Sequence, residues 1–142
     1  IIHLVRDVRS VVSSLLNVSW APKDIEFIFP RQWSSTNVHL HQAMQGKDNY
    51  FFLRYEDMVA SPEKSFSEVT QFLELEFEEN MLNELNRGVL LRKRQSHHKN
   101  LASPFLTSRI NAWESEVPSE IIKHAEQSAD EGLKAFGYQN VS

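Results

Sequence analysis

An arginine lies near the start of the chain, where an apolar segment changes to a helical pattern. Ile1–Val5 is apolar and β-branched, as expected of a short buried strand, and Arg6 follows it directly. Asp7–Leu16 then has apolar residues at helical spacing. Anions bind readily where a strand ends and a helix begins. Arg6 can therefore bind a phosphate with two parallel hydrogen bonds, and Ser14 adds a hydroxyl two turns along. The alternative is a surface ion pair between Arg6 and Asp7.

A tyrosine follows the second apolar segment in the same way. Asn49–Leu53 has the composition of a strand, and the polar residues Arg54–Asp57, expected to form a turn, include Tyr55. The carboxyl ends of parallel strands meet at one edge of a sheet, so we expect Tyr55 to lie at the same edge as Arg6. A tyrosine there offers a nucleotide a hydroxyl and a ring face. The alternative is that Tyr55 only packs against the strand.

A third candidate is the basic stretch Arg92–Lys99, in which Ser96 stands among cationic residues. Such a stretch either binds phosphate groups or forms a solvated charged surface. It also leaves open a binding module that grips RNA or an acidic partner. The cationic candidates for ligand binding are Arg92, Lys93 and Arg94.

The order of the expected elements predicts a parallel α/β fold, with strands Ile1–Val5 and Asn49–Leu53 among helices. Two parallel strands cannot cover their own faces, so we expect further strands from an upstream part of the protein. Ala21–Pro30 is expected to be irregular, with Ile25, Phe27, Ile28 and Phe29 packed inward. The expected helices are Asp7–Leu16, Arg31–Gln45, one starting at Ser61–Pro62, Glu78–Arg87, a short one through Trp113, and one from Pro118 to Gly137.

Composition narrows the possible functions. The 142 residues suit one domain, and a net charge of -4 gives no general reason to expect a nucleic acid partner. The longest apolar runs are too short to span a bilayer, so we expect no membrane contact within the chain. There is no cysteine, and the pairs His39/His41 and His97/His98 lack carboxylate partners at suitable spacing. We therefore expect no metal site.

Read together, these segments resemble the sulfotransferases that use 3'-phosphoadenosine-5'-phosphosulfate (PAPS). Leu4–Ser14 is similar to the family's 3'-phosphate-binding segment, an arginine after a strand with a serine eight residues later. Arg54–Pro62 resembles its Tyr-Glu-Asp-Leu-x-x-x-Pro signature. Leu73–Phe77 fits the Leu-Gly-Leu-x-Phe that follows, with Glu74 in place of glycine. The tail from Arg109 to Tyr138 is similar to the family's closing helices. The resemblance implies that residues 1–142 are the C-terminal portion of a partial P-loop-like three-layer sulfotransferase domain, with the N-terminal portion absent.

The resemblance also implies roles for individual residues. Arg6 and Ser14 would bind the 3'-phosphate, and Tyr55 would contact the nucleoside. Further contacts would come from the basic stretch, with Ser96 the best single candidate beside Arg92, Lys93 and Arg94. Relatives often carry a basic residue directly before the tryptophan of the penultimate helix, but this chain has Ala112 there. Whether Arg109 or Lys99 replaces that contact is open.

The family's phosphosulfate-binding loop and its catalytic base are expected upstream, so we assign no catalytic residue to this chain and expect it to be inactive alone. His3 is interpreted as structural. The acceptor (carbohydrate, protein tyrosine, lipid or small molecule), the oligomeric state and the compartment, cytoplasm or Golgi lumen, stay open. One alternative class is a P-loop kinase-like nucleotide-binding fragment, but no Gly-x-x-x-x-Gly-Lys-Ser/Thr motif occurs. The other is the binding module based on the basic stretch.

Overall fold

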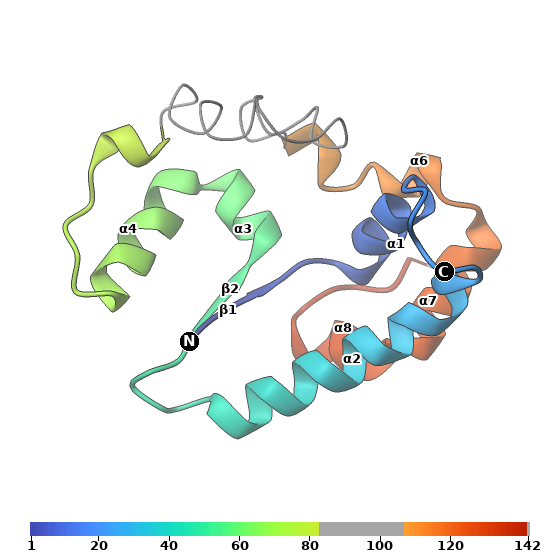
Figure 1. Cartoon of the computed structure of the whole chain (residues 1–142), viewed down its shortest axis with the longest axis horizontal. Helices are drawn as coiled ribbons and strands as arrows, with labels where there is room; N and C mark the ends of the chain where they lie inside the picture. Colours follow the sequence, from blue (N-terminus) through green and yellow to red (C-terminus); the bar gives the residue numbers. More distant parts are fainter. Residues whose placement is uncertain (83–106, 142) are drawn as a thin grey trace. The chain divides into compact units, whose positions relative to one another are not determined.

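The computed structural model describes residues 1–82 and 107–141 (Figure 1). The chain divides into two compact units. The first unit combines Ile1–Tyr55 with Ser108–Ser142, and the second comprises Glu56–Thr107. The basic stretch and its predicted site residues Arg92, Lys93, Arg94 and Ser96 lie outside the described residues, as does Lys99.

A two-stranded parallel sheet runs through the first unit (Figure 1). Strand β1 (Ile2–Val5) pairs with β2 (Phe51–Arg54), from Ile2 opposite Phe51 to Val5 opposite Arg54. The predicted mixed α/β class with parallel strands is confirmed. His3 and Val5 are buried, whereas Ile2 and Leu4, which alternate with them, are 42% and 47% exposed. One face of β1 is therefore covered within the described structure and the other is not.

Helices of the first unit come from both ends of the chain: α1 (Val8–Leu16), α2 (Ile25–Met44), α6 (Trp113–Glu116), α7 (Ser119–Ser128) and α8 (Asp130–Ala135). A short 3₁₀ segment, η2 (Thr107–Arg109), precedes α6. Together they enclose a hydrophobic core to which β1, α1, α2 and the C-terminal segment all contribute. Its members are Val5, Val8, Val12, Trp33, Val38, Trp113, Val117, Ile121, Ile122, Ala129, Leu133, Phe136 and Tyr138.

Three of the predicted helix boundaries are wrong. The short helix predicted through Trp113 is one of them, because α6 starts at Trp113 and the 3₁₀ segment η2 precedes it. Helix α2 begins at Ile25 and not at Arg31, and it contains Pro30. Proline removes one backbone donor, yet Pro30 stands inside α2, where its side chain is buried. The helix predicted from Pro118 to Gly137 is interrupted at Ala129, where the backbone leaves helical geometry (φ -115°, ψ 17°).

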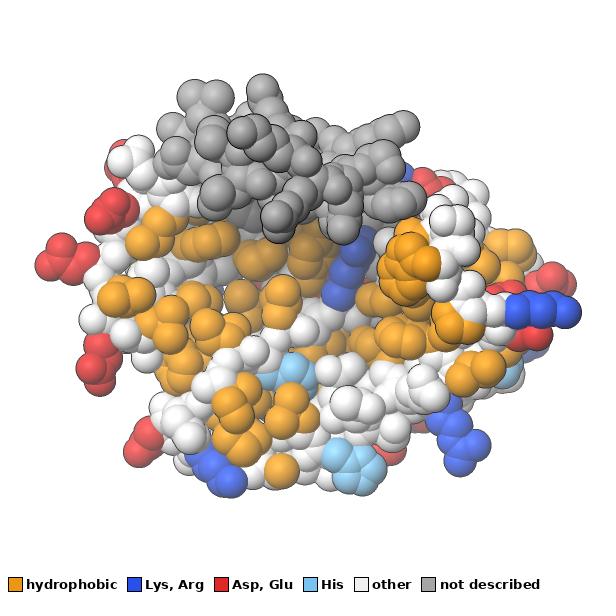
Figure 2. Space-filling view, viewed as in Figure 1, with side chains coloured by type: hydrophobic (Ala, Val, Ile, Leu, Met, Phe, Trp, Pro, Cys, Tyr) orange, Lys and Arg blue, Asp and Glu red, His pale blue; other side chains and the backbone are white. Residues whose placement is uncertain are grey.

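The first turns of α2 pack inward only in part: Phe29 packs against the core, as predicted. Phe27 and Ile28 were expected to face inward but are 47% and 51% exposed, because residues 25–30 are helical and only one side of a helix can face the core. Trp20 is 67% exposed as well. Hydrophobic side chains are visible on the face of the molecule drawn in Figure 2.

The second unit contains α4 (Pro62–Phe72) and η1 (Glu79–Leu82), and α3 (Tyr55–Ala60) begins where β2 ends. The predicted polar turn Arg54–Asp57 is therefore wrong, because Tyr55 already starts a helix. The predicted helix start at Ser61–Pro62 is confirmed. Of the helix predicted over Glu78–Arg87, the described part is the 3₁₀ segment η1. In the described parts of the chain, no helix combines the length and apolarity needed to cross a membrane.

Candidate functional site

Arg6 lies in the turn between β1 and α1, and Tyr55 directly follows β2. Because Val5 pairs with Arg54, the next residue of each strand lies at the same edge of the sheet. The guanidinium carbon of Arg6 lies 4.7 Å from the centre of the Tyr55 ring. The prediction that these two residues share an edge is confirmed, and their contact is a cation–π interaction.

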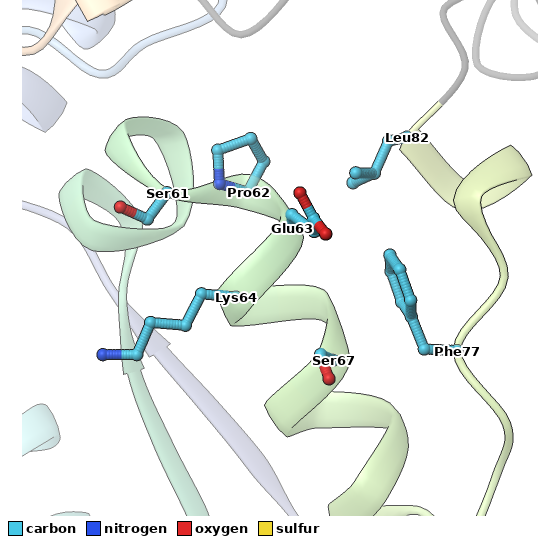
Figure 3. A pocket seen from close by; sticks show the side chains of 7 residues that line it. All are labelled: Ser61, Pro62, Glu63, Lys64, Ser67, Phe77 and Leu82. Atoms are coloured by element: carbon cyan, nitrogen blue, oxygen red, sulfur yellow. The ribbon is translucent and has the colours of Figure 1, made fainter.

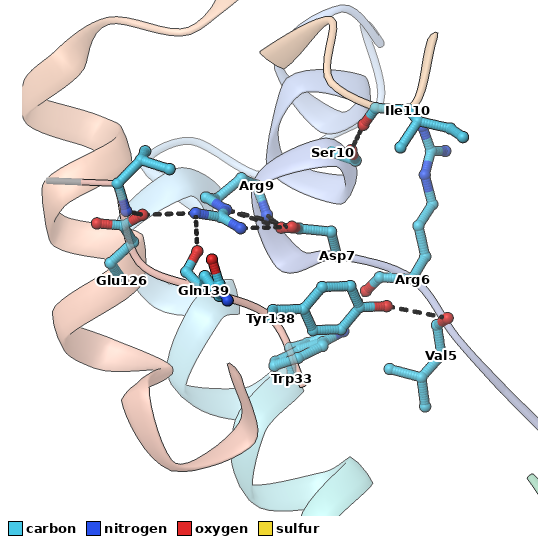
Figure 4. A network of polar contacts seen from close by, with 11 residues as sticks. Val5, Arg6, Asp7, Arg9, Ser10, Trp33, Ile110, Glu126, Tyr138 and Gln139 are labelled. Atoms are coloured by element: carbon cyan, nitrogen blue, oxygen red, sulfur yellow. Dashed lines mark hydrogen bonds and ion pairs between the residues drawn. The ribbon is translucent and has the colours of Figure 1, made fainter. Parts of the chain in front are cut away.

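The guanidinium of Arg6 forms no ion pair within the described residues. Its Nε is buried and has no hydrogen-bond partner there, although the residue as a whole is half-buried. In Figure 4 the side chain points away from that of Asp7. A partly buried cation without a carboxylate partner favours an anionic ligand, because a buried polar group without a hydrogen bond costs free energy.

The alternative ion pair between Arg6 and Asp7 is wrong, because Asp7 is bound to Arg9. The carboxylate of Asp7 caps α1 by accepting a hydrogen bond from the Arg9 backbone at 2.8 Å. It also accepts three hydrogen bonds from the Arg9 side chain, from Nε at 3.0 and 3.3 Å and from an η-nitrogen at 2.7 Å. Arg9 is 4% exposed, so this pair is in the interior (Figure 4).

A second buried carboxylate completes the cluster around Arg9. The other η-nitrogen donates to Glu126 at 2.6 Å and to the backbone oxygen of Gln139 at 2.9 Å, and the Trp113 ring lies 4.1 Å from the guanidinium carbon. Burial opposes the charge of Arg9, but the hydrogen bonds and charges of Asp7 and Glu126 outweigh it and raise the pKa of Arg9. Sequence reasoning missed this residue. The Asp-x-Arg spacing at a helix start was the only local signal.

Ser14 is exposed on α1, and its hydroxyl makes no hydrogen bond within the described residues. It lies one turn after Ser10, whose hydroxyl donates to the backbone oxygen of Ile110 at 2.9 Å. Six residues separate it from Val8, the first residue of α1, a rise of about 9 Å along the helix. No hydrogen bond joins Arg6 and Ser14 among the described residues, so the structure does not itself bring these two side chains together.

Arg109, one candidate to replace the basic residue missing at Ala112, is already paired. Its guanidinium binds Glu116 through both η-nitrogens, one of them 3.0 Å from a carboxylate oxygen. Glu116 also accepts a hydrogen bond from Ser13 at 3.0 Å. The hydrogen bond from Arg109, and to a smaller extent the one from Ser13, lowers the pKa of Glu116. The hydrogen bond to Glu116 in turn raises the pKa of Arg109. Unlike Arg6, Arg109 therefore already has a carboxylate partner.

The histidines before residue 82 have structural partners. The His3 ring nitrogens lie 2.6 Å from the Tyr50 hydroxyl and 2.8 Å from Oδ1 of Asn37, and His41 Nδ1 lies 2.9 Å from the same hydroxyl. Burial raises the pKa of Tyr50. The contacts of His3 are those expected of a structural histidine, as it was interpreted from the sequence. Among the described residues, no group of three or more potential metal ligands occurs.

A pocket of about 610 Å³ lies in the second unit, beside the start of α4 (Figure 3). None of the predicted site residues lines it. Its charged side chains, Glu63 and Lys64, are exposed and have opposite signs. Its lining therefore gives no reason to expect a strong preference for an anion. The lining residues are Ser61, Pro62, Glu63, Lys64, Ser67, Phe77 and Leu82.

Comparison with known proteins identifies the family. A family model described as "Sulfotransferase family" matches residues 1–79, more than half of the chain. The matched range contains Arg6, Ser14 and Tyr55. Searches of curated proteins and of solved structures gave no match. The resemblance found in the sequence and the family model agree, and this chain belongs to the sulfotransferase family.

Proposed function

We propose that this chain binds the 3'-phosphate and nucleoside half of PAPS in an enzyme that transfers the sulfuryl group to a hydroxyl or amine acceptor. Membership of the sulfotransferase family supports sulfuryl transfer in general. The observation that carries the donor assignment is the state of Arg6. Its guanidinium lies at the end of β1, beside the start of a helix, with a buried Nε that has no partner among the described residues.

The chemistry at this edge suits a nucleotide that carries a phosphate on its ribose. In the proposal, the phosphate takes the place of the partner that Arg6 lacks, and the N-terminal end of α1 favours its charge. Ser14 donates its unused hydroxyl from two turns along the helix. Tyr55 offers its ring edge or hydroxyl to the nucleoside while its face supports Arg6. The ribose 3'-phosphate separates PAPS from ATP, so these residues determine which nucleotide binds.

The reaction itself is an in-line displacement at sulfur. An acceptor oxygen or nitrogen forms a bond to the sulfur, and the bond between sulfur and the bridging oxygen of the donor breaks. Adenosine 3',5'-bisphosphate leaves with the electron pair, and the proton of the acceptor goes to a base. We assign neither that base nor the phosphosulfate contacts to residues of this chain, whose proposed part is to hold the donor in place.

We also propose that the two-stranded sheet belongs to a larger P-loop-like, three-layer domain of which residues 1–142 are the C-terminal portion. The exposed Ile2 and Leu4 support this proposal, because parallel strands are usually covered on both faces. A layer packed on Ile2 and Leu4 would complete the sheet on its uncovered face.

The donor assignment is tested with two nucleotides that differ only in the ribose phosphate. We expect the complete protein to bind adenosine 3',5'-bisphosphate more tightly than AMP in isothermal titration calorimetry. Charge-assisted hydrogen bonds contribute roughly 1.5–3 kcal/mol each, so Arg6→Ala should weaken binding of the bisphosphate by at least about tenfold. Binding of AMP should hardly change, because AMP lacks the group that Arg6 holds.

Arg31→Ala is the matched control, since Arg31 is an exposed arginine of α2 in the same unit. It should leave both affinities unchanged. If the Arg6→Ala protein still binds the bisphosphate more tightly than AMP by the same factor, Arg6 is not part of the donor site. Thermal protection by ATP with magnesium, but not by the bisphosphate, would point instead to kinase-like chemistry.

A further inference from the structure

We infer that Arg9 is a positioning residue for the donor site: it fixes the turn between β1 and α1 so that Arg6 is held ready for the ribose phosphate. This inference rests on the proposed function. Arg9 does not need to touch the nucleotide, since its guanidinium is 4% exposed and is surrounded by the protein's own groups. It acts through the backbone of Arg6 and Asp7.

The first step of the argument is the link between Arg9 and the turn. Asp7 directly follows Arg6 and is the N-cap of α1, with an extended backbone (φ -48°, ψ 126°). Its carboxylate binds both the backbone nitrogen and the forked side chain of Arg9. The orientation of Asp7, and with it the direction in which Arg6 leaves the strand, is therefore tied to the position of the Arg9 guanidinium.

The second step is the anchor at the other end of Arg9. Glu126 of α7, at 1% exposure, accepts a hydrogen bond from Arg9 at 2.6 Å and another from the backbone of Val141 at 2.9 Å. Gln139 adds its backbone oxygen at 2.9 Å. A planar guanidinium with donors on several sides can hold Asp7 and Glu126 at once, which a single ammonium group cannot do with the same geometry.

The third step is that hydrogen bonds from side chains elsewhere in the unit also hold the backbone of Val5 and Arg6. Trp33 Nε1 donates to the backbone oxygen of Arg6 at 3.1 Å, and the Tyr138 hydroxyl donates to that of Val5 at 3.4 Å (Figure 4). Val5 and Arg6 thus each bond directly to another part of the unit, and Asp7 is linked to α7 through Arg9. The Arg6 guanidinium, in contrast, contacts the Tyr55 ring without an ion pair among the described residues.

A rigid turn around a cation that lacks a partner is the arrangement expected of a preorganised anion site. Binding is stronger when the protein has already fixed the group that meets the ligand, because less conformational freedom is lost. If Arg9 acts in this way, weakening its hold on Asp7 must lower the affinity for the ribose phosphate, and it must do so only while Arg6 is present.

The test is a double-mutant cycle in the complete protein, with adenosine 3',5'-bisphosphate as the probe in calorimetry. Arg9→Lys keeps the positive charge between the two carboxylates but loses the fork. We expect it to weaken binding of the bisphosphate by about tenfold in the wild-type background, because small displacements of a binding group are costly. In the Arg6→Ala background the same change should alter binding by less than about twofold. Affinity for AMP should not respond.

Two further variants separate positioning from loss of stability. Glu126→Gln keeps a hydrogen-bond acceptor at the far end of Arg9 and should show the same dependence on Arg6, so it replaces Arg9→Lys if that protein does not fold. Ile122→Val, in the core of the same unit, should lower the melting temperature without changing affinity for the bisphosphate.

The outcomes are distinguishable. Equal weakening by Arg9→Lys with and without Arg6, or a matching loss of affinity for AMP, would show a general structural effect and overturn the inference. Normal affinity in both Arg9→Lys and Glu126→Gln would overturn it as well, even where Arg6→Ala weakens binding. If Arg6→Ala itself has no effect, the proposed donor site fails first, and the inference fails with it.

Discussion

At the scale of single residues, three arginines of the first unit show how partners decide the role of a side chain. Arg9 is buried between two carboxylates and has a structural part in the fold. Arg109 is exposed and bound to one carboxylate, that of Glu116. Arg6 has an aromatic ring beneath it and no carboxylate within the described residues. The same functional group thus serves as an internal anchor, a surface partner and a candidate ligand-binding group.

The pair of Arg109 and Glu116 gives a prediction for pH dependence. Arg109 lowers the pKa of Glu116, so the ionised carboxylate is favoured in the folded state. The resulting stabilisation is present above about pH 4.3, the ordinary value for glutamate, and is lost as the pH falls through the lowered pKa. We expect Arg109→Gln to raise the pKa of Glu116 toward its ordinary value, measured by NMR titration of the side-chain carboxyl.

Lys134→Gln is the control for that titration, because Lys134 pairs with Asp130 of α8 and not with Glu116. It should leave the titration of Glu116 unchanged. The stability difference between wild type and Arg109→Gln should also shrink as the pH falls through the lowered pKa of Glu116, below which Glu116 is protonated in both proteins. An unchanged pKa of Glu116 in Arg109→Gln would show that the ion pair does not form in solution.

At the scale of elements, the close approach of α8 to α2 supports the turn that carries Arg6. The backbone nitrogen of Gly132 donates to the Ser34 hydroxyl at 2.9 Å. Trp33, next to that serine, is 6% exposed and donates its indole hydrogen to the backbone oxygen of Arg6. The glycine therefore lets a C-terminal helix pack directly against the part of α2 that touches the candidate site.

A side chain at position 132 does not fit this contact. A Cβ atom there would lie 2.6 Å from Cζ3 of Trp33 and 2.9 Å from the Ser34 hydroxyl. We expect Gly132→Ala to destabilise the protein by about 1–3 kcal/mol, as overpacked cores do, even though alanine favours a helix by about 1 kcal/mol over glycine. Chemical denaturation measures the change. Lys134→Ala, an exposed position of the same helix, should change stability by less than about 0.5 kcal/mol. A more stable Gly132→Ala protein would contradict the packing.

At the scale of the whole molecule, the first unit is assembled from segments far apart in the chain. Residues 1–55 and 108–142 share one core, and the second unit comprises the residues between them. Arg9 and Glu126, which bind each other, are 117 positions apart. The candidate donor site therefore depends on C-terminal residues that lie outside the range matched by the family model.

Removal of the C-terminal segment tests this assembly. A protein that ends at residue 107 loses Trp113, Leu133, Phe136 and the rest of the C-terminal share of the core. We expect Trp33 to become exposed and cooperative unfolding of the first unit to disappear, measured by tryptophan fluorescence and near-ultraviolet circular dichroism. Adding a peptide of residues 108–142 should restore part of the signal. An unchanged spectrum after the truncation would contradict the shared core.

Much of the first unit can be predicted from the sequence, because the signals involved are local. Apolar runs indicate both strands, and the helical pattern after Asp7 indicates α1. The rule that parallel strands end at one edge is enough to bring Arg6 and Tyr55 together. The order of these motifs also indicates the family. Each inference needs only neighbouring residues and a general property of parallel sheets.

Other features were decided by tertiary structure, because they depend on partners distant in the sequence. Local reasoning allowed Asp7 to pair with Arg6, but the fork of Arg9, held by Glu126 from α7, takes that carboxylate instead. The start of α2 at Ile25, with Pro30 inside the helix, and the break at Ala129 were likewise not indicated by proline positions or periodicity. The sequence alone indicates that a basic residue between β1 and α1 can bind an anion. The tertiary structure decides that Arg9 is bound to carboxylates, whereas Arg6 has none among the described residues.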